Sequence, residues 1–358
     1  MELISALPED VARDCLIRIS YQHFPVVSSV SKAWNTEIQS PEFRRRRTTA
    51  NQTQKILVAV QSRVDSDEKR RTGLLVKAAT NPVYQLSVLE PKTGNWSELP
   101  PAPELPNGLP MFCRIAGVGY DLVVIGGWDP DSWKASNSVF IYNFLSATWR
   151  RGADMPGGPR TFFACVSDNH HTVYVAGGHD DEKNALKSVL AYDVSRDAWT
   201  ALPDMSRERD ECKGIFRGGV LRVVGGYCTE MQGRFERTAE EFDSATCKWG
   251  PVEEEFLDVA TCPRTCVDGG DDELYICCDG DVLILKGDTW QTVVKVPEEI
   301  RNVSYMEARE GALLLIGSGG FGQPHMSFLF DLKSSNWAKL ASPENYSGHV
   351  QFGCSLEI

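Results

Sequence analysis

The chain has 358 residues, of which 42% are hydrophobic and 24% are charged, and this ordinary globular composition excludes disordered, collagen-like and fibrous classes. Its 49 acidic residues outnumber 37 Lys and Arg, and the net charge of −12 argues against nucleic acid or an anionic membrane as a partner, because both attract clustered positive charge. A chain of this length is expected to form either two or more domains or one repeat architecture.

The start of the chain has an acidic residue at Glu2 and no apolar run of signal-peptide length, so nothing marks it for secretion. No stretch approaches the roughly 18 apolar residues of a membrane-spanning helix. The 11 cysteines are an odd number scattered along the chain, which favours reduced thiols over a disulfide framework. We therefore expect the protein in the cytoplasm, the nucleus or both.

Residues 3–47 have the pattern of short amphipathic helices. Pro8, followed by two acidic residues, is a good helix start. Apolar residues at helical spacing then occur in two runs: Val11, Cys15, Leu16 and Ile19, followed by Val27, Val30, Trp34 and Ile38. About forty residues with this much apolar surface would be marginally stable alone, so we expect part of that surface to dock on a partner.

The same segment carries a leucine-proline start at residues 7–8, a valine-serine-lysine-x-tryptophan centre at 30–34 and a proline-x-phenylalanine end at 41–43. This pattern resembles the F-box, whose short helices bind the adaptor Skp1 of cullin-RING ubiquitin ligases. The resemblance implies an F-box domain over 1–47. It also implies that six residues contact the adaptor or shape the helices that do so: Leu7, Pro8, Leu16, Ile19, Val30 and Trp34.

Two positions depart from the F-box pattern. Ser31 stands where many members have cysteine, and residues 21–24 replace a commoner proline-rich turn. The alternative interpretation is an isolated helical cap that packs on the rest of the chain.

From about residue 54 onward the chain is an internal repeat. Four apolar runs end in paired glycines, and the second glycines of the pairs, at positions 127, 178, 226 and 320, lie 51, 48 and 94 residues apart. After each pair an aromatic residue precedes a tryptophan by seven positions: Tyr142 and Trp149, Tyr192 and Trp199, Phe242 and Trp249, Phe330 and Trp337. Two degenerate copies, Leu89 with Trp96 and Leu283 with Trp290, bring the total to six units.

Each unit has short β-branched and aromatic runs and no long helical pattern, so we expect each to be a small antiparallel sheet. The paired glycines would end a strand where the backbone needs a positive φ or a close approach, and the tryptophan would pack between adjacent sheets. Six such units resemble kelch repeats and predict an all-β propeller of about six blades over 55–358, after a linker at 48–54. The segment 348–356 is similar to a first strand without a following blade, so we expect it to close the ring. We interpret the charged stretch 65–71 as an insertion in the first blade.

An F-box followed directly by kelch repeats is a combination typical of plants. The whole chain is similar to plant F-box/kelch proteins, and its opening and repeat texture resemble the subgroup that targets phenylalanine ammonia-lyase. Members of that subgroup are also linked to the turnover of cytokinin response regulators. The resemblance implies a non-catalytic substrate receptor of a Skp1-cullin-F-box (SCF) ubiquitin ligase, with the adaptor as direct partner, cullin as indirect partner and a target protein on the propeller.

Binding sites on propellers usually lie where loops of several blades converge. Such loops carry two unrepeated tryptophans and four arginines at corresponding positions, which we predict as target-binding residues: Trp128, Trp133, Arg160, Arg209, Arg264 and Arg301. The alternative for the arginines is a structural bond repeated in each blade, to carbonyl groups of the neighbouring strands.

No Ser-His-Asp set, phosphate loop or nucleotide fingerprint is present, and we expect no cofactor. The cysteine pair 262 and 266 has no second pair at zinc-ligand spacing, so no metal site is predicted. Some kelch propellers are enzymes, however, and others are scaffolds. A propeller enzyme and a scaffold that binds without degradation remain the alternatives to a ligase receptor.

Overall fold

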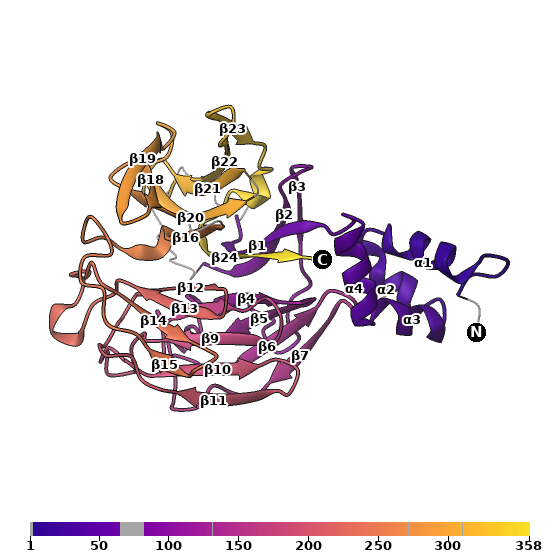
Figure 1. Ribbon diagram of the computed structural model, residues 1–358, viewed down its shortest axis with the longest axis horizontal. Coiled ribbons are helices and arrows are strands. Elements are labelled where there is room, and N and C mark those ends of the chain that lie inside the picture. The colour runs from indigo at the N-terminus through magenta and orange to yellow at the C-terminus, as the bar shows by residue number, and fades with distance from the viewer. Residues whose placement is uncertain (1–2, 65–81, 131, 271–272, 310) are drawn as a thin grey trace, which may run out of the picture.

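The computed structural model describes residues 3–64, 82–130, 132–270, 273–309 and 311–358. A small helical unit lies against one side of a ring of β-sheets (Figure 1). Among the described helices, none is both long enough and apolar enough to cross a membrane. The stretch 65–71, expected to be an insertion, lies outside the described residues.

The described part of the helical unit contains four α-helices: α1 (Glu9–Ile17), α2 (Phe24–Ser28), α3 (Lys32–Ile38) and α4 (Pro41–Thr49). Serine caps set where the last two begin. The Ser31 hydroxyl accepts a hydrogen bond from the Trp34 amide at 3.2 Å, and the Ser40 hydroxyl accepts one from the Phe43 amide at 3.1 Å. The second apolar run is therefore divided between α2 and α3, and α4 extends two residues into the predicted linker.

The structure corrects the predicted apolar face of α1. Leu16 is buried, together with Ala12 and Ile17. Val11 is 42% exposed and Cys15 is exposed, so two of the residues predicted for the buried face lie on the solvent side, beside exposed Glu9, Asp10 and Asp14. One face forms the core, and the other remains open to a partner.

The described chain forms six four-stranded antiparallel sheets, which confirms the predicted six-bladed propeller. In chain order the strands are β1 (Lys55–Ser62), β2 (Tyr84–Glu90) and β3 (Asn95–Glu98) with β24 (Val350–Glu357) in blade 1; β4 (Arg114–Val118), β5 (Asp121–Ile125), β6 (Val139–Asn143) and β7 (Thr148–Gly152) in blade 2; β8 (Ala164–Ser167), β9 (Thr172–Ala176), β10 (Val189–Asp193) and β11 (Ala198–Leu202) in blade 3; β12 (Lys213–Arg217), β13 (Val220–Val224), β14 (Ala239–Asp243) and β15 (Lys248–Trp249) in blade 4; β16 (Val267–Gly270), β17 (Glu273–Cys278), β18 (Asp281–Lys286) and β19 (Thr289–Lys295) in blade 5; and β20 (Asn302–Arg309), β21 (Ala312–Ser318), β22 (His325–Asp331) and β23 (Asn336–Leu340) in blade 6.

The seven-residue spacing has a geometric cause. Tyr142 and Trp149 are direct cross-strand partners in the hairpin of β6 and β7. The Asn143 side chain accepts the amides of Leu145 and Ser146 at 3.0 Å, which fixes the turn between them. The unit in blade 5 differs from the prediction, because a tighter turn pairs Trp290 with Leu285 and not with Leu283.

The repeat tryptophans join the blades to one another. In the described structure the indole N–H of each donates to a main-chain carbonyl of the preceding blade: Trp96 to Ala341 (3.2 Å), Trp149 to Pro100 (2.8 Å), Trp199 to Ala153 (2.8 Å), Trp249 to Pro203 (2.8 Å), Trp290 to Phe256 (2.7 Å) and Trp337 to Lys295 (3.0 Å). Because the first tryptophan bonds to blade 6, this series of bonds is continuous around the ring. The predicted packing of tryptophan between sheets is confirmed.

The paired glycines permit a close approach of backbones. Gly178 has φ +81°, and a Cβ placed there would lie 2.4 Å from the Thr161 carbonyl oxygen. No larger residue fits this position without a shift of the main chain.

The ring closes as the sequence predicted. β24 pairs with β1 in an antiparallel ladder that includes Val58 opposite Cys354. Beyond the ladder, the amide and carbonyl of Ile358 exchange hydrogen bonds with Gln54 at 2.9 and 2.6 Å. The closing strand therefore reaches the chain segment that connects the helices to the propeller.

The helical unit and the ring share one hydrophobic core. Phe24 and Tyr21 pack edge-on against Tyr120 and Phe144 of blade 2, with ring centroids 6.4 and 5.9 Å apart. Leu16 and Phe43 belong to the same buried cluster as the inner residues of blades 1 and 2. This shared core restricts the orientation of the two parts relative to each other.

Arg47 lies at the centre of this junction and is fully buried. Its guanidinium donates to the carbonyls of Ile17 and Ile19 at 2.5 and 2.7 Å and to the main-chain oxygen of Ile358 at 3.2 Å. The same group lies over the ring of Phe24, 4.9 Å from its centroid. One side chain of α4 thus joins the end of α1, the following turn and the end of the closing strand.

We predict that Arg47→Met lowers the free energy of unfolding by roughly 2–4 kcal/mol, because three carbonyls lose a charged donor in a site that excludes water. Urea unfolding followed by tryptophan fluorescence measures this change. Arg46→Met is the matched control: the Arg46 side chain is 40% exposed and pairs with Glu42 on its own helix, so the expected change is below about 0.5 kcal/mol. Equal effects of the two substitutions would contradict the assigned role.

Candidate functional site

The first candidate surface is the outer side of the helical unit. Among described residues, the large hydrophobic side chains that are exposed there are Leu7 (38%), Val11 (42%), Val26 (67%) and Val30 (60%). The unit spans about 45 residues, yet it carries almost as many exposed large hydrophobics as the much longer ring. Such a concentration of apolar surface marks a protein-binding face.

The predicted adaptor residues divide into two groups. Leu7, Pro8 and Val30 are exposed and available to a partner. Leu16 is buried, while Ile19 and Trp34 are partly buried and pack against the shared core. The indole N–H of Trp34 donates to the Leu3 carbonyl, which ties the segment before α1 to α3.

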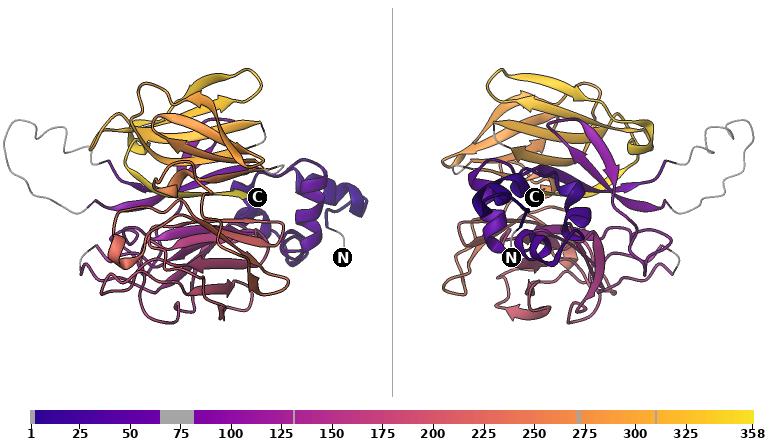
Figure 2. Two further views of the ribbon diagram at one scale, coloured as in Figure 1. Left: turned by 60° about the vertical axis from the view of Figure 1, so that its left-hand side comes forward. Right: turned by 90° about the vertical axis from the view of Figure 1, so that its right-hand side faces the viewer.

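The second candidate surface is the mouth of the ring, on the face away from the helices. β1 begins beside α4 and runs for eight residues, about 26 Å at 3.3 Å per residue, before it reaches this face at Ser62. The right-hand view of Figure 2 shows the helices in front of the ring, so the mouth lies behind it in that view. A partner on the helices and a partner at the mouth therefore occupy opposite ends of the molecule.

Two of the predicted target-binding arginines prove to be structural. Arg160 is 4% exposed and donates to the Ser188 hydroxyl at 3.0 Å and to the Gly177 and Ser188 carbonyls. Arg209 is 1% exposed and bonds to the Gly225 carbonyl at 2.8 Å and to Glu240 at 3.1 Å. Each guanidinium satisfies carbonyls at the glycine end of a strand in its own blade. The alternative foreseen for these residues is the correct one.

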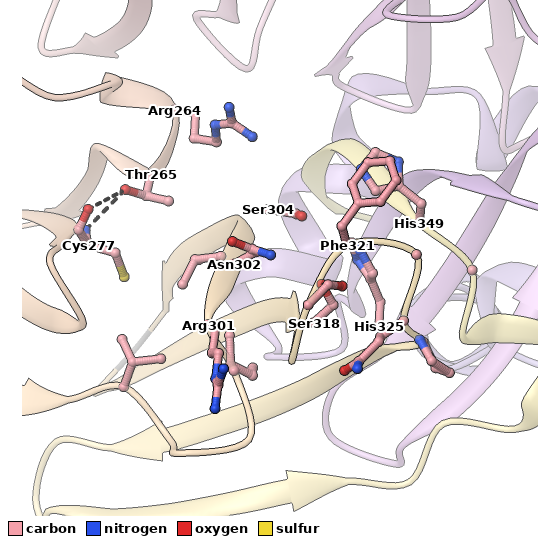
Figure 3. Close-up of a pocket in the computed structure, with 18 of the residues that line it drawn as sticks. Arg264, Thr265, Cys277, Arg301, Asn302, Ser304, Ser318, Phe321, His325 and His349 are labelled. Atoms are coloured by element: carbon pink, nitrogen blue, oxygen red, sulfur yellow. Dashed lines mark hydrogen bonds between the residues drawn. The ribbon is translucent and has the colours of Figure 1, made fainter.

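Arg264 and Arg301 are exposed and line a hollow of about 910 Å³ at the mouth. Figure 3 shows Arg264 on one side of this hollow and Phe321, His325 and His349 on the other. The described charged side chains around it are Arg63, Arg264 and Arg301 against Asp279. This part of the mouth is thus basic on a protein with a net charge of −12.

Aromatic side chains cover the neighbouring part of the mouth. Trp133 is 55% exposed and packs edge-on against Trp128, with centroids 6.5 Å apart. Trp128 contacts Phe112 at 6.2 Å, and Phe112 contacts Phe162 at 4.9 Å. The two predicted tryptophans therefore belong to a continuous aromatic row, and Phe321 on blade 6 is fully exposed across the mouth.

Three residues at the mouth adopt a backbone conformation that side chains usually avoid. Phe112, Phe162 and Glu211 occupy equivalent positions in blades 2, 3 and 4 and have φ values of 60°, 55° and 52°. Such conformations cost about 1–3 kcal/mol each and concentrate at ligand sites. The sequence analysis did not identify these three positions. Each lies two residues before the first strand of its blade, β4, β8 or β12, and this shared repeat position could have pointed to them.

Three buried cysteines at the centre of the ring are poor nucleophiles. Burial raises the pKa of Cys113, Cys165 and Cys266 to about 12, so these thiols stay protonated at neutral pH. Within the described ranges, no three His, Cys, Asp or Glu side chains lie close enough together to hold a metal ion.

The comparisons with known proteins agree with this geometry. An F-box domain model matches residues 4–46, which include α1, α2, α3 and most of α4. A kelch motif model matches residues 111–156 and 159–206, which are blades 2 and 3. Two Arabidopsis thaliana proteins, the F-box/kelch-repeat proteins At1g80440 and At1g15670, are each 50% identical over the full length of both chains. A third, F-box/kelch-repeat protein At2g44130, is 35% identical and covers 74% of this chain and 68% of its own.

This chain belongs to the F-box/kelch-repeat family. The family explains why one polypeptide joins an apolar helical face to a ring. The kelch motif model matches blades 2 and 3 of the six. The structure shows that the remaining blades form four-stranded sheets of the same kind as blades 2 and 3.

The mouth also contains a histidine that links ring closure to pH. His325 of β22 is 5% exposed, and its Nδ1 accepts the Val350 amide of β24 at 3.2 Å. Burial, together with the neighbouring His349, lowers the pKa of His325 from 6.5 to about 4. The folded protein therefore holds this imidazole neutral at a pH where the unfolded chain protonates it.

We predict that stability falls as the pH falls from about 6.5 to about 4, since only the unfolded state gains a proton at His325 in that window; the loss is about 3 kcal/mol. His325→Asn keeps an acceptor for Val350 and should flatten this part of the profile, measured by urea unfolding at each pH. His170→Asn, in an exposed turn between β8 and β9, is the control that leaves the slope as in the unmodified protein. An unchanged slope in His325→Asn would contradict the assignment.

Proposed function

We propose that this protein is the substrate receptor of an SCF ubiquitin ligase. Its F-box face binds a Skp1-like adaptor and through it a cullin, and the mouth of the kelch ring binds a target protein for ubiquitination and proteasomal degradation. One observation carries the proposal: an F-box unit with exposed Leu7, Val11, Val26 and Val30 is joined through a shared core to a ring whose mouth faces the other way.

In this role the protein does no covalent chemistry. It holds the target near the ligase and so raises the effective concentration of target lysines at the ubiquitin-transfer site. Arg47 and the shared core fix the direction of the mouth relative to the adaptor face. A fixed direction favours lysines on one region of the target over others.

The target would be recognised through the aromatic row and the basic hollow together. Exposed Trp133 and Phe321 provide apolar anchors, and Arg264 and Arg301 provide charged donors. Trp and Arg are the residues that most often dominate binding energy at protein interfaces. The resemblance to the plant subgroup makes phenylalanine ammonia-lyase the first target class to test, with regulation of phenylpropanoid synthesis as the consequence, and cytokinin response regulators the second.

The two alternatives differ from the receptor in what they require. A propeller enzyme needs a reactive centre, and the buried thiols of Cys113 and Cys165, whose pKa values are raised, do not supply one. A scaffold that binds without degradation needs no adaptor face. We propose action in the cytoplasm, the nucleus or both, where SCF ligases operate.

We predict that Val11→Glu with Val30→Glu weakens binding of a Skp1-like adaptor at least about tenfold, because two carboxylates would be buried in an apolar interface. The fold should be unchanged, since both side chains are exposed. Isothermal titration calorimetry of the full chain against the adaptor measures the effect. Val259→Glu, at a residue 46% exposed on the propeller, is the matched control, and adaptor binding that survives the double substitution would refute the assigned face.

We predict that Trp133→Ala with Phe321→Ala removes the target but retains the adaptor, because both side chains anchor at the mouth and neither touches the helices. Co-purification from plant extract with the proteasome blocked, followed by mass spectrometry, separates the two partners. Arg196→Ala serves as control, in an exposed turn between β10 and β11. Loss of adaptor and target together would indicate misfolding, and retention of every target would place the binding surface elsewhere.

A further inference from the structure

Below the mouth, the centre of the ring contains a second cavity of about 210 Å³. Its wall is formed by the beginnings of β4, β8 and β12 and by β24. Three cations line it: Arg264, which also lines the mouth hollow, and Arg114 and Lys213. Arg114, Lys213 and the ring of Phe352, which also lines the cavity, form what we call the channel cluster. Arg114 and Lys213 are the first residues of β4 and β12, so they hold the same repeat position in blades 2 and 4.

The two cations of the channel cluster share one aromatic ring. The guanidinium carbon of Arg114 lies 4.7 Å from the Phe352 centroid, and the Lys213 ammonium lies 5.4 Å from it. Neither side chain forms a hydrogen bond or an ion pair with any residue that the structure describes, and the Nε of Arg114 is buried without a partner. The Phe352 ring is thus their main interaction.

Arg114 differs from Arg47, Arg160 and Arg209 in having no oxygen acceptor for its guanidinium among the described residues. Arg47, Arg160 and Arg209 each donate to two or more oxygens. In the channel, burial and the charge of Arg114 lower the pKa of Lys213 to about 8, and burial also lowers the pKa of Arg114. Both side chains are half-buried, so each charge is only partly hydrated, and an accompanying anion would offset part of that cost.

The cavity wall does not supply that anion. Glu211 is the carboxylate among the described lining residues, and its oxygen accepts the Tyr227 hydroxyl at 2.9 Å without an ion pair to either cation. The neighbouring thiols of Cys113, Cys165 and Cys212 have raised pKa values and stay neutral. The cavity is consequently positive inside a strongly acidic protein.

We propose that the channel cluster binds a small oxyanion, a phosphate or a small carboxylate, that accepts hydrogen bonds from Arg114 and Lys213. A cavity of about 210 Å³ lies below the range of roughly 300–1,000 Å³ typical for larger organic ligands, which favours a compact anion. The site lies directly beneath Phe112 and Phe162 at the mouth. It is separate from the F-box face, so it does not depend on the ligase role.

Isothermal titration calorimetry of the full chain with inorganic phosphate, and in a second arm with malonate, tests the proposal at constant ionic strength. We expect binding in at least one arm, and a loss of about tenfold or more in affinity for Lys213→Met and for Arg114→Met, because each removes a charged hydrogen bond. Lys213→Arg should retain binding. Which arm binds more tightly distinguishes phosphate from carboxylate as the ligand class.

Lys339→Met is the matched control, because Lys339 also lies 5.4 Å from a phenylalanine centroid, that of Phe328, but outside the cavity. Arg222→Met plays the same part for Arg114, at 4.9 Å from Phe256. Both should bind the anion as the unmodified protein does. Equal loss in the control and channel variants would overturn the proposal.

A second measurement needs no substitution and therefore does not depend on the folding of any variant. Acetic anhydride modifies unprotonated lysines, and mass spectrometry reads the extent at each site. At about pH 8 an anion in the channel should slow the acetylation of Lys213 several-fold and leave Lys339 unchanged. No binding in either calorimetry arm, or no selective protection of Lys213 at saturating phosphate and malonate, would overturn the proposal.

Discussion

The burial of the Arg47 guanidinium is the constraint on which the arrangement of the described structure depends. An arginine cannot shed its charge, so a fully buried one requires acceptors. Here the acceptors come from the end of α1, the turn after it and Ile358 beyond β24. The helices, the connecting segment and the closing strand are therefore held by one group, and the F-box cannot turn freely relative to the ring.

The same residue type serves three purposes in this molecule, and the acceptors within reach decide which. Arg160 and Arg209 meet carbonyls of their own blades and hold strand ends in place. Arg264 and Arg301 project into an open hollow, where a partner can supply acceptors. Arg114 lies between these cases: it is half-buried, and its Nε is buried with no acceptor among the described residues. Whether an arginine here is structural or available to a ligand is thus decided by the acceptors around it and not by the residue type.

The sequence predicted the fold well because each blade repeats the same cross-strand pairs and turn caps. It failed at Leu283, because a hairpin with a shorter turn shifts the partner of Trp290 to Leu285. It could not separate Arg160 from Arg264, since both precede a first strand and their burial depends on distant loops. Nor could the sequence show that Arg114 and Lys213 lie against the same Phe352 ring. The spacing of a repeat along the chain does not reveal which residues point to the axis of the ring.

The position of β24 also bears on how the protein is made. The chain emerges from the ribosome with its N-terminus first, so the F-box segment emerges long before residues 350–358. Until those residues appear, Arg47 lacks one of its acceptors and β1 presents an unpaired edge. The nascent chain therefore carries an open sheet edge and an incompletely anchored apolar helical unit through most of its synthesis.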